Sequence, residues 1–259
     1  MLDFTTDVER SADSAMDDSW IAELTRDEHE KLIVALDYQS DDEALDLVND
    51  LGDTVVYYKV GLELLFGGGL DLAKRLRDMG KTVFLDMKLH DIPNTVEKSV
   101  RNISKMGFNY LTVHGVDIRT LDAAVTGRGE SDLNLLAVTV LTSAGDAELK
   151  QWGTDLTTHE LGLRRARMAF DAGFTGVIAS GHEAMSIRNQ TSNEFLIKVP
   201  GIRLPSDDAG DQSRVMTPAV AIEQSADYLV VGRPITQAPS RRRAAMKFLQ
   251  AIVSARTET

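Results

Sequence analysis

The sequence of 259 residues contains no cysteine. Disulfides, thiolate zinc sites, iron–sulfur clusters and cysteine nucleophiles are therefore excluded. The five histidines show neither H-x-H nor H-E-x-x-H spacing, so we expect no metal site. No apolar run approaches the roughly 20 residues that cross a bilayer, and the N-terminus lacks a basic segment followed by an apolar stretch. We therefore expect no membrane-spanning segment, no Sec-type export and a cytoplasmic location.

Basic residues are scarce, with 28 Lys and Arg against 40 Asp and Glu, which gives a net charge of −12. The compact basic cluster Arg241–Arg243 is interpreted as the solvated start of a helix. Duplex binding requires clustered Lys and Arg side chains, so the composition predicts no nucleic-acid partner.

The acidity is concentrated at the start of the chain, where residues 1–30 hold ten acidic and two basic side chains. We interpret these residues as an acidic extension that is partly disordered, followed by one domain over residues 31–259. Within the extension, Trp20, Ile21 and Leu24 have the spacing of a helical turn that packs on this domain.

From residue 32 onward, short β-branched runs alternate with amphipathic stretches of helical length. The predicted strands are residues 32–38, 54–61, 82–89, 110–115, 134–141, 176–180, 195–201 and 228–234. Helix-capping signals lie between them at Ser40 with Glu43, Asn94 with Glu97, Thr157 with Glu160, and Thr217 before Pro218. Eight such units predict an α/β fold, a single-domain parallel (β/α)₈ TIM barrel. The alternative, a doubly wound open sheet, is disfavoured because no G-x-G-x-x-G follows the first strand.

The strand at 82–89 carries charges where a barrel strand is normally apolar. Asp86 and Lys88 are two residues apart, so the period of a strand sends both to one face, near the C-terminal end of the barrel. Lys59 near the end of the preceding strand and Asp91 in the following loop are expected to converge there. Coupled buried charges of this kind are candidates for chemistry. The alternative is a satisfied salt-bridge network without a catalytic role, which adds little stability over apolar packing.

A second candidate site lies after the last two strands, in Pro200–Arg203 and Val231–Pro234. Loops at this place in many barrels bind phosphate through backbone N–H groups and a helix start, and an Arg side chain adds a bidentate contact. The polar segment 204–214 between them suits a mobile lid. The alternative is an ordinary surface loop with two scattered arginines.

Together these segments resemble the bacterial-type orotidine 5′-phosphate decarboxylase family over roughly residues 31–252. The most specific match is the run DMKLHDIPNT at residues 86–95. The other matches, in order, are Ala35-Leu36-Asp37, Lys59-Val60-Gly61, Pro200-Gly201-Ile202-Arg203, Gly210-Asp211-Gln212 and Val231-Gly232-Arg233-Pro234. The resemblance implies decarboxylation of orotidine 5′-monophosphate to UMP, the last step of de novo UMP synthesis, without metal or organic cofactor.

The resemblance also implies a role for each matching residue. Lys88 matches the lysine that protonates C6 of the pyrimidine, and Asp86 matches the carboxylate beside the departing CO₂ group. Lys59 and Asp91 complete the charged array, and Asp91 reaches the neighbouring subunit's site, which implies a homodimer. The implied substrate contacts are Asp37 and Thr95 at the ribose, Thr142 at the pyrimidine, and Arg203, Gln212, Gly232 and Arg233 at the phosphate. Lys59 of the charged array is also an implied substrate-binding residue.

Two competing functions remain open at this point. One is a carbon–carbon bond-forming enzyme that resembles hexulose-phosphate synthase and uses Mg²⁺; such relatives usually have an acidic residue where this chain has Lys59. The other is a non-catalytic phosphate-binding barrel, whose expected mark is loss of the lysine that this chain retains as Lys88.

Overall fold

The computed structural model of the chain describes residues 19–205, 207 and 214–257. The first part of the acidic extension, residues 1–18, lies outside the described residues, as does Gln212 of the predicted phosphate site. In the part of the chain that the structure describes, no helix combines the length and apolar character needed to cross a membrane.

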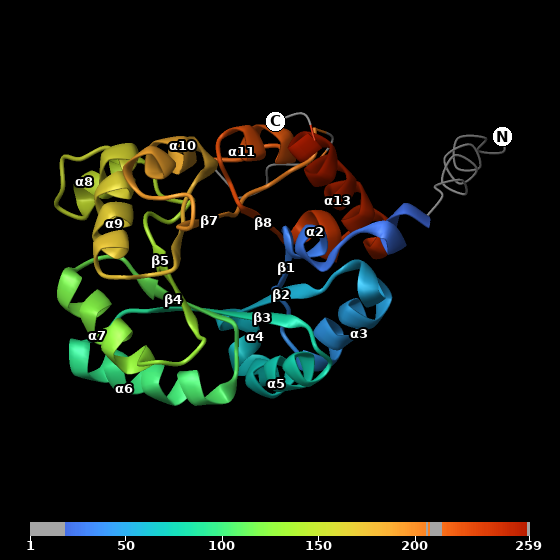
Figure 1. Cartoon of the computed structure of the whole chain (residues 1–259), viewed down its shortest axis with the longest axis horizontal. Coiled ribbons are helices and arrows are strands. Elements are labelled where there is room, and N and C mark those ends of the chain that lie inside the picture. The colour runs from blue at the N-terminus through green and yellow to red at the C-terminus, as the bar shows by residue number, and fades with distance from the viewer. Residues whose placement is uncertain (1–18, 206, 208–213, 258–259) are drawn as a thin grey trace.

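Eight parallel strands pair in sequence order, and β8 closes the barrel by pairing with β1. Figure 1 shows the strands as an inner ring with the helices around it. The strands are β1 (Leu32–Leu36), β2 (Tyr57–Gly61), β3 (Thr82–Leu89), β4 (Tyr110–His114), β5 (Asn134–Val138), β6 (Gly176–Ile178), β7 (Leu196–Val199) and β8 (Tyr228–Val231). The predicted (β/α)₈ fold is confirmed, and the open-sheet alternative is wrong.

Helices connect successive strands on the outside of this ring. The longer ones are α3 (Asp41–Leu51), α5 (Leu70–Asp78), α6 (Pro93–Ile103), α7 (Ile118–Arg128), α9 (Thr158–Asp171), α10 (Gly181–Gln190) and α13 (Arg241–Thr257). Shorter ones are α4 (Leu62–Leu64), α8 (Asp146–Gln151), α11 (Pro218–Glu223) and α12 (Arg233–Thr236), with short turns η2 (Gly52–Thr54), η3 (Leu65–Gly69) and η4 (Ser104–Met106).

Most of the predicted caps are present, and one is wrong. Thr157 forms a full capping box with Glu160 at the start of α9, and the Thr217 side chain accepts the N–H of Val220, the third residue of α11. Asn94, by contrast, is not a cap: α6 begins at Pro93 with Ile92 as N-cap residue and no side-chain cap bond. Proline fixes the backbone of the first helical position, so the helix starts one residue before the predicted cap.

The alternating pattern of the strands separates two apolar layers. The cluster inside the barrel consists of Ile33, Ala35, Tyr57, Phe84, Leu136, Tyr228 and Val230, with Tyr110, Ile178 and Leu196 packed against it. A second, larger cluster joins other apolar strand residues to the helices outside the barrel. Three charged residues each follow an interior residue by two positions: Asp37 follows Ala35, Lys59 follows Tyr57, and Asp86 follows Phe84. The strand period therefore directs these charges to the inner face at the C-terminal mouth.

Residues 19–30 cover the opposite end of the barrel. The turn η1 (Ser19–Glu23) buries Ile21, and Trp20 and Leu24 pack against the outer core, as the spacing predicted. Helix α2 (Arg26–Glu30) then bonds to the first residue of β3, because the Thr82 hydroxyl donates to Glu30 Oε1 at 2.8 Å.

Candidate active site

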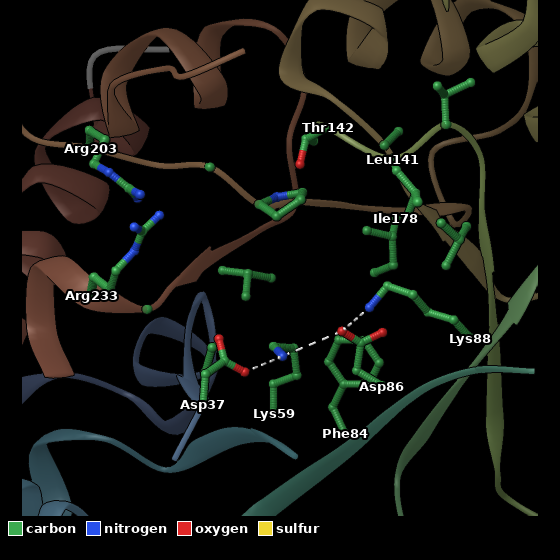
Figure 2. A pocket seen from close by; sticks show the side chains of 18 residues that line it. Asp37, Lys59, Phe84, Asp86, Lys88, Leu141, Thr142, Ile178, Arg203 and Arg233 are labelled. Atoms are coloured by element: carbon green, nitrogen blue, oxygen red, sulfur yellow. Dashed lines mark hydrogen bonds and ion pairs between the residues drawn. The ribbon is translucent and has the colours of Figure 1, made fainter. Parts of the chain in front are cut away.

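Four residues of alternating charge line one wall of the pocket at the barrel mouth (Figure 2). This charged array consists of Asp37, Lys59, Asp86 and Lys88. Lys59 Nζ lies 3.0 Å from Asp37 Oδ1 and 3.4 Å from Asp86 Oδ2. Lys88 Nζ lies 2.6 Å from the same Asp86 Oδ2. The expected convergence of Lys59, Asp86 and Lys88 is therefore present, and both ammonium groups contact one carboxylate oxygen.

The pairing of opposite charges keeps Lys59 and Asp86 ionised. Burial alone would raise the pKa of Asp86, but the ammonium groups of Lys59 and Lys88 and hydrogen bonds from Lys88 and Thr112 hold it below the usual value. Burial would lower the pKa of Lys59, but the carboxylates of Asp86 and Asp37 raise it above the usual value. Asp86 therefore stays a carboxylate and Lys59 stays an ammonium group, although both side chains are largely buried.

The backbone next to these side chains has two unusual features, a glycine at position 61 and a positive φ at Lys88. Gly61 follows Lys59 on the inner face of β2, and a Cβ at this position would lie 3.0 Å from Lys59 Nζ and 3.4 Å from Asp37 Oδ1. Lys88 has a positive φ of 46°, which is uncommon for a residue with a side chain. The strand is therefore irregular where the regular period of two predicted the direction of Lys88, although its amine still reaches Asp86.

Thr112 on β4 is a polar contact of the array that the sequence did not reveal. Its fully buried hydroxyl donates to Asp86 Oδ1 at 2.9 Å and accepts the backbone N–H of Lys88 at 2.9 Å. A threonine within a β-branched strand carries no sequence signal of such a contact, because threonine is also a common strand former.

Two arginines occupy the other end of the pocket. Arg203, which follows β7, is buried, and its Nη1 donates to the carbonyl of Ile202 at 2.8 Å. Arg233 begins α12, with Gly232 as N-cap residue. Figure 2 shows the two guanidinium groups directed toward each other, across the pocket from Lys88, with Thr142 on a third side.

The pocket thus has the charged array on one side, the two arginines at the other end, and mostly apolar residues between them. The remaining lining residues are Ala35, Phe84, Val138, Val140, Leu141, Ile178, Ala179, Pro200, Gly201, Val230 and Gly232. An elongated ligand with an anionic group at one end suits this arrangement.

Two predicted site residues do not reach the pocket of their own chain. Asp91 is exposed, and its Oδ1 accepts the N–H of Ile92 at 2.6 Å. Thr95 is half-buried in the first turn of α6, and neither residue lines the pocket. The expected convergence of Asp91 with Lys59, Asp86 and Lys88 is therefore wrong for a single chain, because the chain turns outward after β3. Asp37, which pairs with Lys59, is instead the fourth charged residue of the array.

Among the described residues, no group of three or more His, Asp or Glu side chains is arranged to hold a metal ion. The Asp37 and Asp86 carboxylates in the pocket both face ammonium groups.

The sequence is similar to those of known proteins over most of its length. The family model described as "Orotidine 5′-phosphate decarboxylase / HUMPS family" matches residues 30–248. A relative from Bradyrhizobium sp. (strain ORS 278), named orotidine 5′-phosphate decarboxylase, is 47% identical over 226 residues, which cover 87% of this chain and 93% of the relative. One from Rhodopseudomonas palustris (strain BisA53), with the same name, is 45% identical over 228 residues, covering 88% and 97%.

A solved structure has the same architecture. The crystal structure of orotidine 5′-phosphate decarboxylase from Lactobacillus acidophilus superposes with a TM-score of 0.74 at 35% identity, covering 85% of this chain and 98% of that one. Sequence and fold thus lead to one assignment: this chain belongs to the orotidine 5′-phosphate decarboxylase / HUMPS family.

Proposed function

We propose that this chain decarboxylates orotidine 5′-monophosphate to UMP and CO₂, without a metal or an organic cofactor. The observation that carries the proposal is the Asp37–Lys59–Asp86–Lys88 chain, which faces two arginines across one pocket. Such a pocket matches a substrate with a carboxylate at one end and a phosphate at the other.

Lys88 is the proposed proton donor. When the bond between C6 and the carboxylate breaks, CO₂ leaves and the electron pair stays on C6, in the plane of the pyrimidine ring. Ring π-delocalisation cannot absorb a pair in that plane, so a nearby ammonium group is the natural stabiliser. Lys88 Nζ then transfers a proton to C6, which yields UMP and a neutral amine.

Asp86 has two proposed effects on this step. Its carboxylate holds Lys88 Nζ at 2.6 Å, and its lowered pKa keeps it anionic. An anionic Asp86 repels the substrate carboxylate, and this repulsion is relieved when neutral CO₂ departs. Lys59, which contacts both Asp37 and Asp86, keeps the two carboxylates in place.

The remaining residues are proposed as substrate contacts. Arg203, Arg233, Gly232 and Gln212 bind the phosphate, Asp37 and Lys59 bind the substrate near the ribose, and Thr142 contacts the pyrimidine. Thr95 lies outside the pocket of its own chain, so its proposed ribose contact is to the substrate in a neighbouring subunit. The phosphate is remote from C6, so its binding energy can be used to hold the reacting end in a productive position.

We also propose a homodimer in which Asp91 completes the site of the neighbouring subunit. Asp91 is exposed rather than directed into its own pocket. Large apolar side chains are exposed in the segments that follow β2 and β3, with Phe66 87% and Ile92 66% accessible. Large exposed apolar side chains are typical of an interface, and Ile92 is the sequence neighbour of Asp91.

The proposal is tested by incubating chelator-treated protein with orotidine 5′-monophosphate. We expect turnover, recorded as a fall in absorbance as the pyrimidine carboxylate is lost, and UMP as the product. A requirement for added Mg²⁺ would favour the Mg²⁺-dependent alternative, and binding without turnover would favour a phosphate-binding barrel. Either result would reject the proposed reaction.

A further inference from the structure

The pairing of β3 with β4 is irregular beside the charged array. The register pairs Leu85 with Leu111 and Leu89 with Val113. Three residues of β3, Asp86 to Lys88, therefore lie opposite Thr112 alone. A strand with extra residues bends, and some of its backbone groups lose their partners in the ladder.

The side chain of Thr112 takes over part of that lost pairing. Its Oγ1 accepts the backbone N–H of Lys88 at 2.9 Å, which compensates for a missing ladder acceptor where Lys88 adopts its positive φ. The same hydroxyl donates to Asp86 Oδ1 at 2.9 Å. One buried hydroxyl therefore binds the backbone of the lysine and the side chain of the aspartate.

This arrangement fixes which oxygen of Asp86 meets the lysines. Oδ1 is bound by Thr112, and Oδ2 contacts the amines of Lys88 at 2.6 Å and Lys59 at 3.4 Å. An apolar side chain at position 112 would leave the partly buried N–H of Lys88 and the buried Oδ1 of Asp86 without this partner, and such groups are costly to leave unsatisfied.

We propose that Thr112 is a positioning residue of the proposed decarboxylation, an inference that rests on the function proposed above. Its hydroxyl holds the carboxylate plane of Asp86 and the backbone of Lys88 in one fixed relation, so that the Lys88 amine is directed at C6. Thr112 does not line the pocket itself, and it therefore acts through its two neighbours.

The test compares Thr112→Val, which removes the hydroxyl, with Thr112→Ser, which keeps it. A small displacement of a reacting group is enough to reduce the rate by about 10²-fold, so we expect Thr112→Val to lose about that factor in kcat. We expect KM to stay within about threefold, because the phosphate contacts are at the other end of the pocket. Thr112→Ser should retain kcat within about threefold of the wild type.

Thr82→Val is the matched control. Thr82 is also buried, lies on β3, and donates its hydroxyl to a carboxylate, Glu30 Oε1, at 2.8 Å. Thr82 lies at the opposite end of the barrel, so loss of its hydroxyl should lower the stability of the protein while kcat and KM stay unchanged.

Wild-type kcat in Thr112→Val, or an equal loss in Thr112→Ser, would overturn the positioning role while leaving the decarboxylase assignment intact. A raised KM with unchanged kcat would overturn it as well. If Thr112→Val does not melt cooperatively, Thr112→Ala is measured under the same criteria. Absence of turnover in the wild-type protein would instead reject the proposed function, and this inference with it.

Discussion

Lys88 adopts a backbone conformation that residues with a side chain rarely occupy, with φ at +46°. Such strain persists only where the surroundings fix it, and it is found mainly at functional sites. Here the surroundings are the Thr112 hydroxyl on the Lys88 N–H and the Asp86 carboxylate on its amine. The strained backbone and the ion pair together direct one ammonium group into the pocket.

The first prediction concerns this amine. Lys88→Ala removes the proposed proton donor and an electrostatic stabiliser of the carbanion, so kcat should fall by roughly 10³-fold or more. Lys74→Ala is the control, because Lys74 pairs with Asp71 on the exposed side of α5. Steady-state kinetics on both variants provide the measurement; a Lys88→Ala enzyme that keeps even a tenth of wild-type kcat would contradict the role.

The second prediction concerns the phosphate end of the pocket. Arg233→Ala removes a cationic contact far from C6, so KM should rise by roughly 10²-fold while kcat changes less. Arg167→Ala on α9, where the arginine pairs with Asp171, should leave both constants unchanged. If Arg233→Ala reduced kcat alone, the phosphate role would be wrong.

At the scale of the strands, the barrel interior contains a lysine side chain that has no role in the proposed mechanism. Lys198 on β7 is fully buried, and its Nζ lies 2.6 Å from the Tyr57 hydroxyl. The amine is 3.3 Å from the ring centroid of Tyr110 and 4.0 Å from that of Tyr228. Burial holds the pKa of Lys198 well below the usual lysine value, although the charges of Glu30 and Asp227 act in the opposite direction.

The third prediction follows from this lowered pKa. The folded protein binds fewer protons at Lys198 than the unfolded chain, so its contribution to stability increases as pH rises from the folded pKa toward the ordinary value. Lys198→Met should therefore be more stable than the wild type at neutral pH, by about 1–3 kcal/mol. This advantage should shrink as the pH rises from neutral toward the ordinary pKa of lysine, because the unfolded chain then loses the proton that the folded protein does not hold.

Denaturant unfolding of both proteins across that range checks the prediction. A difference between wild type and Lys198→Met that stays constant with pH would show that Lys198 has the same protonation state in the folded and unfolded chain, contrary to the predicted shift.

The strands were the best predicted elements. All eight were located from β-branched runs, because burial on both faces of a parallel barrel imposes an apolar sequence. Their ends were less accurate: the strand predicted to start at residue 54 begins at Tyr57, after the turn η2. Lys198 was treated as part of an ordinary strand, because the three tyrosines around it come from other strands and their approach is a tertiary feature.

The candidate site was predictable where charges interrupt an apolar strand, as Asp86 and Lys88 do. Asp37 was identified only through family resemblance as a ribose contact, and its ion pair with Lys59 emerged from the structure. Thr112 could not be found, because its contact depends on the bulge in β3 and sequence periodicity assumes a regular strand.

At the scale of the whole molecule, one chain leaves Asp91 outside its own pocket. The fourth prediction tests the proposed shared site by subunit mixing. Lys88→Ala and Asp91→Ala should each be nearly inactive alone. In a mixed dimer, one site combines an intact Lys88 with an intact Asp91 from the other subunit. Random reassociation of equal amounts should therefore restore about a quarter of wild-type activity.

Lys88→Ala alone, taken through the same reassociation, is the control and should stay inactive. If the mixture of the two variants showed no recovery although subunits exchange, Asp91 would not be shared across the interface.

In the proposed reaction, the pocket releases CO₂ from orotidine 5′-monophosphate through its own side chains. The most direct measurement is the yield of CO₂ and UMP from substrate labelled in the carboxylate, using chelator-treated wild type beside Lys88→Ala. We expect labelled CO₂ and unlabelled UMP in equal amounts from the wild type and almost none of either from the variant. Unchanged substrate with the wild type, or equal turnover by both proteins, would contradict it.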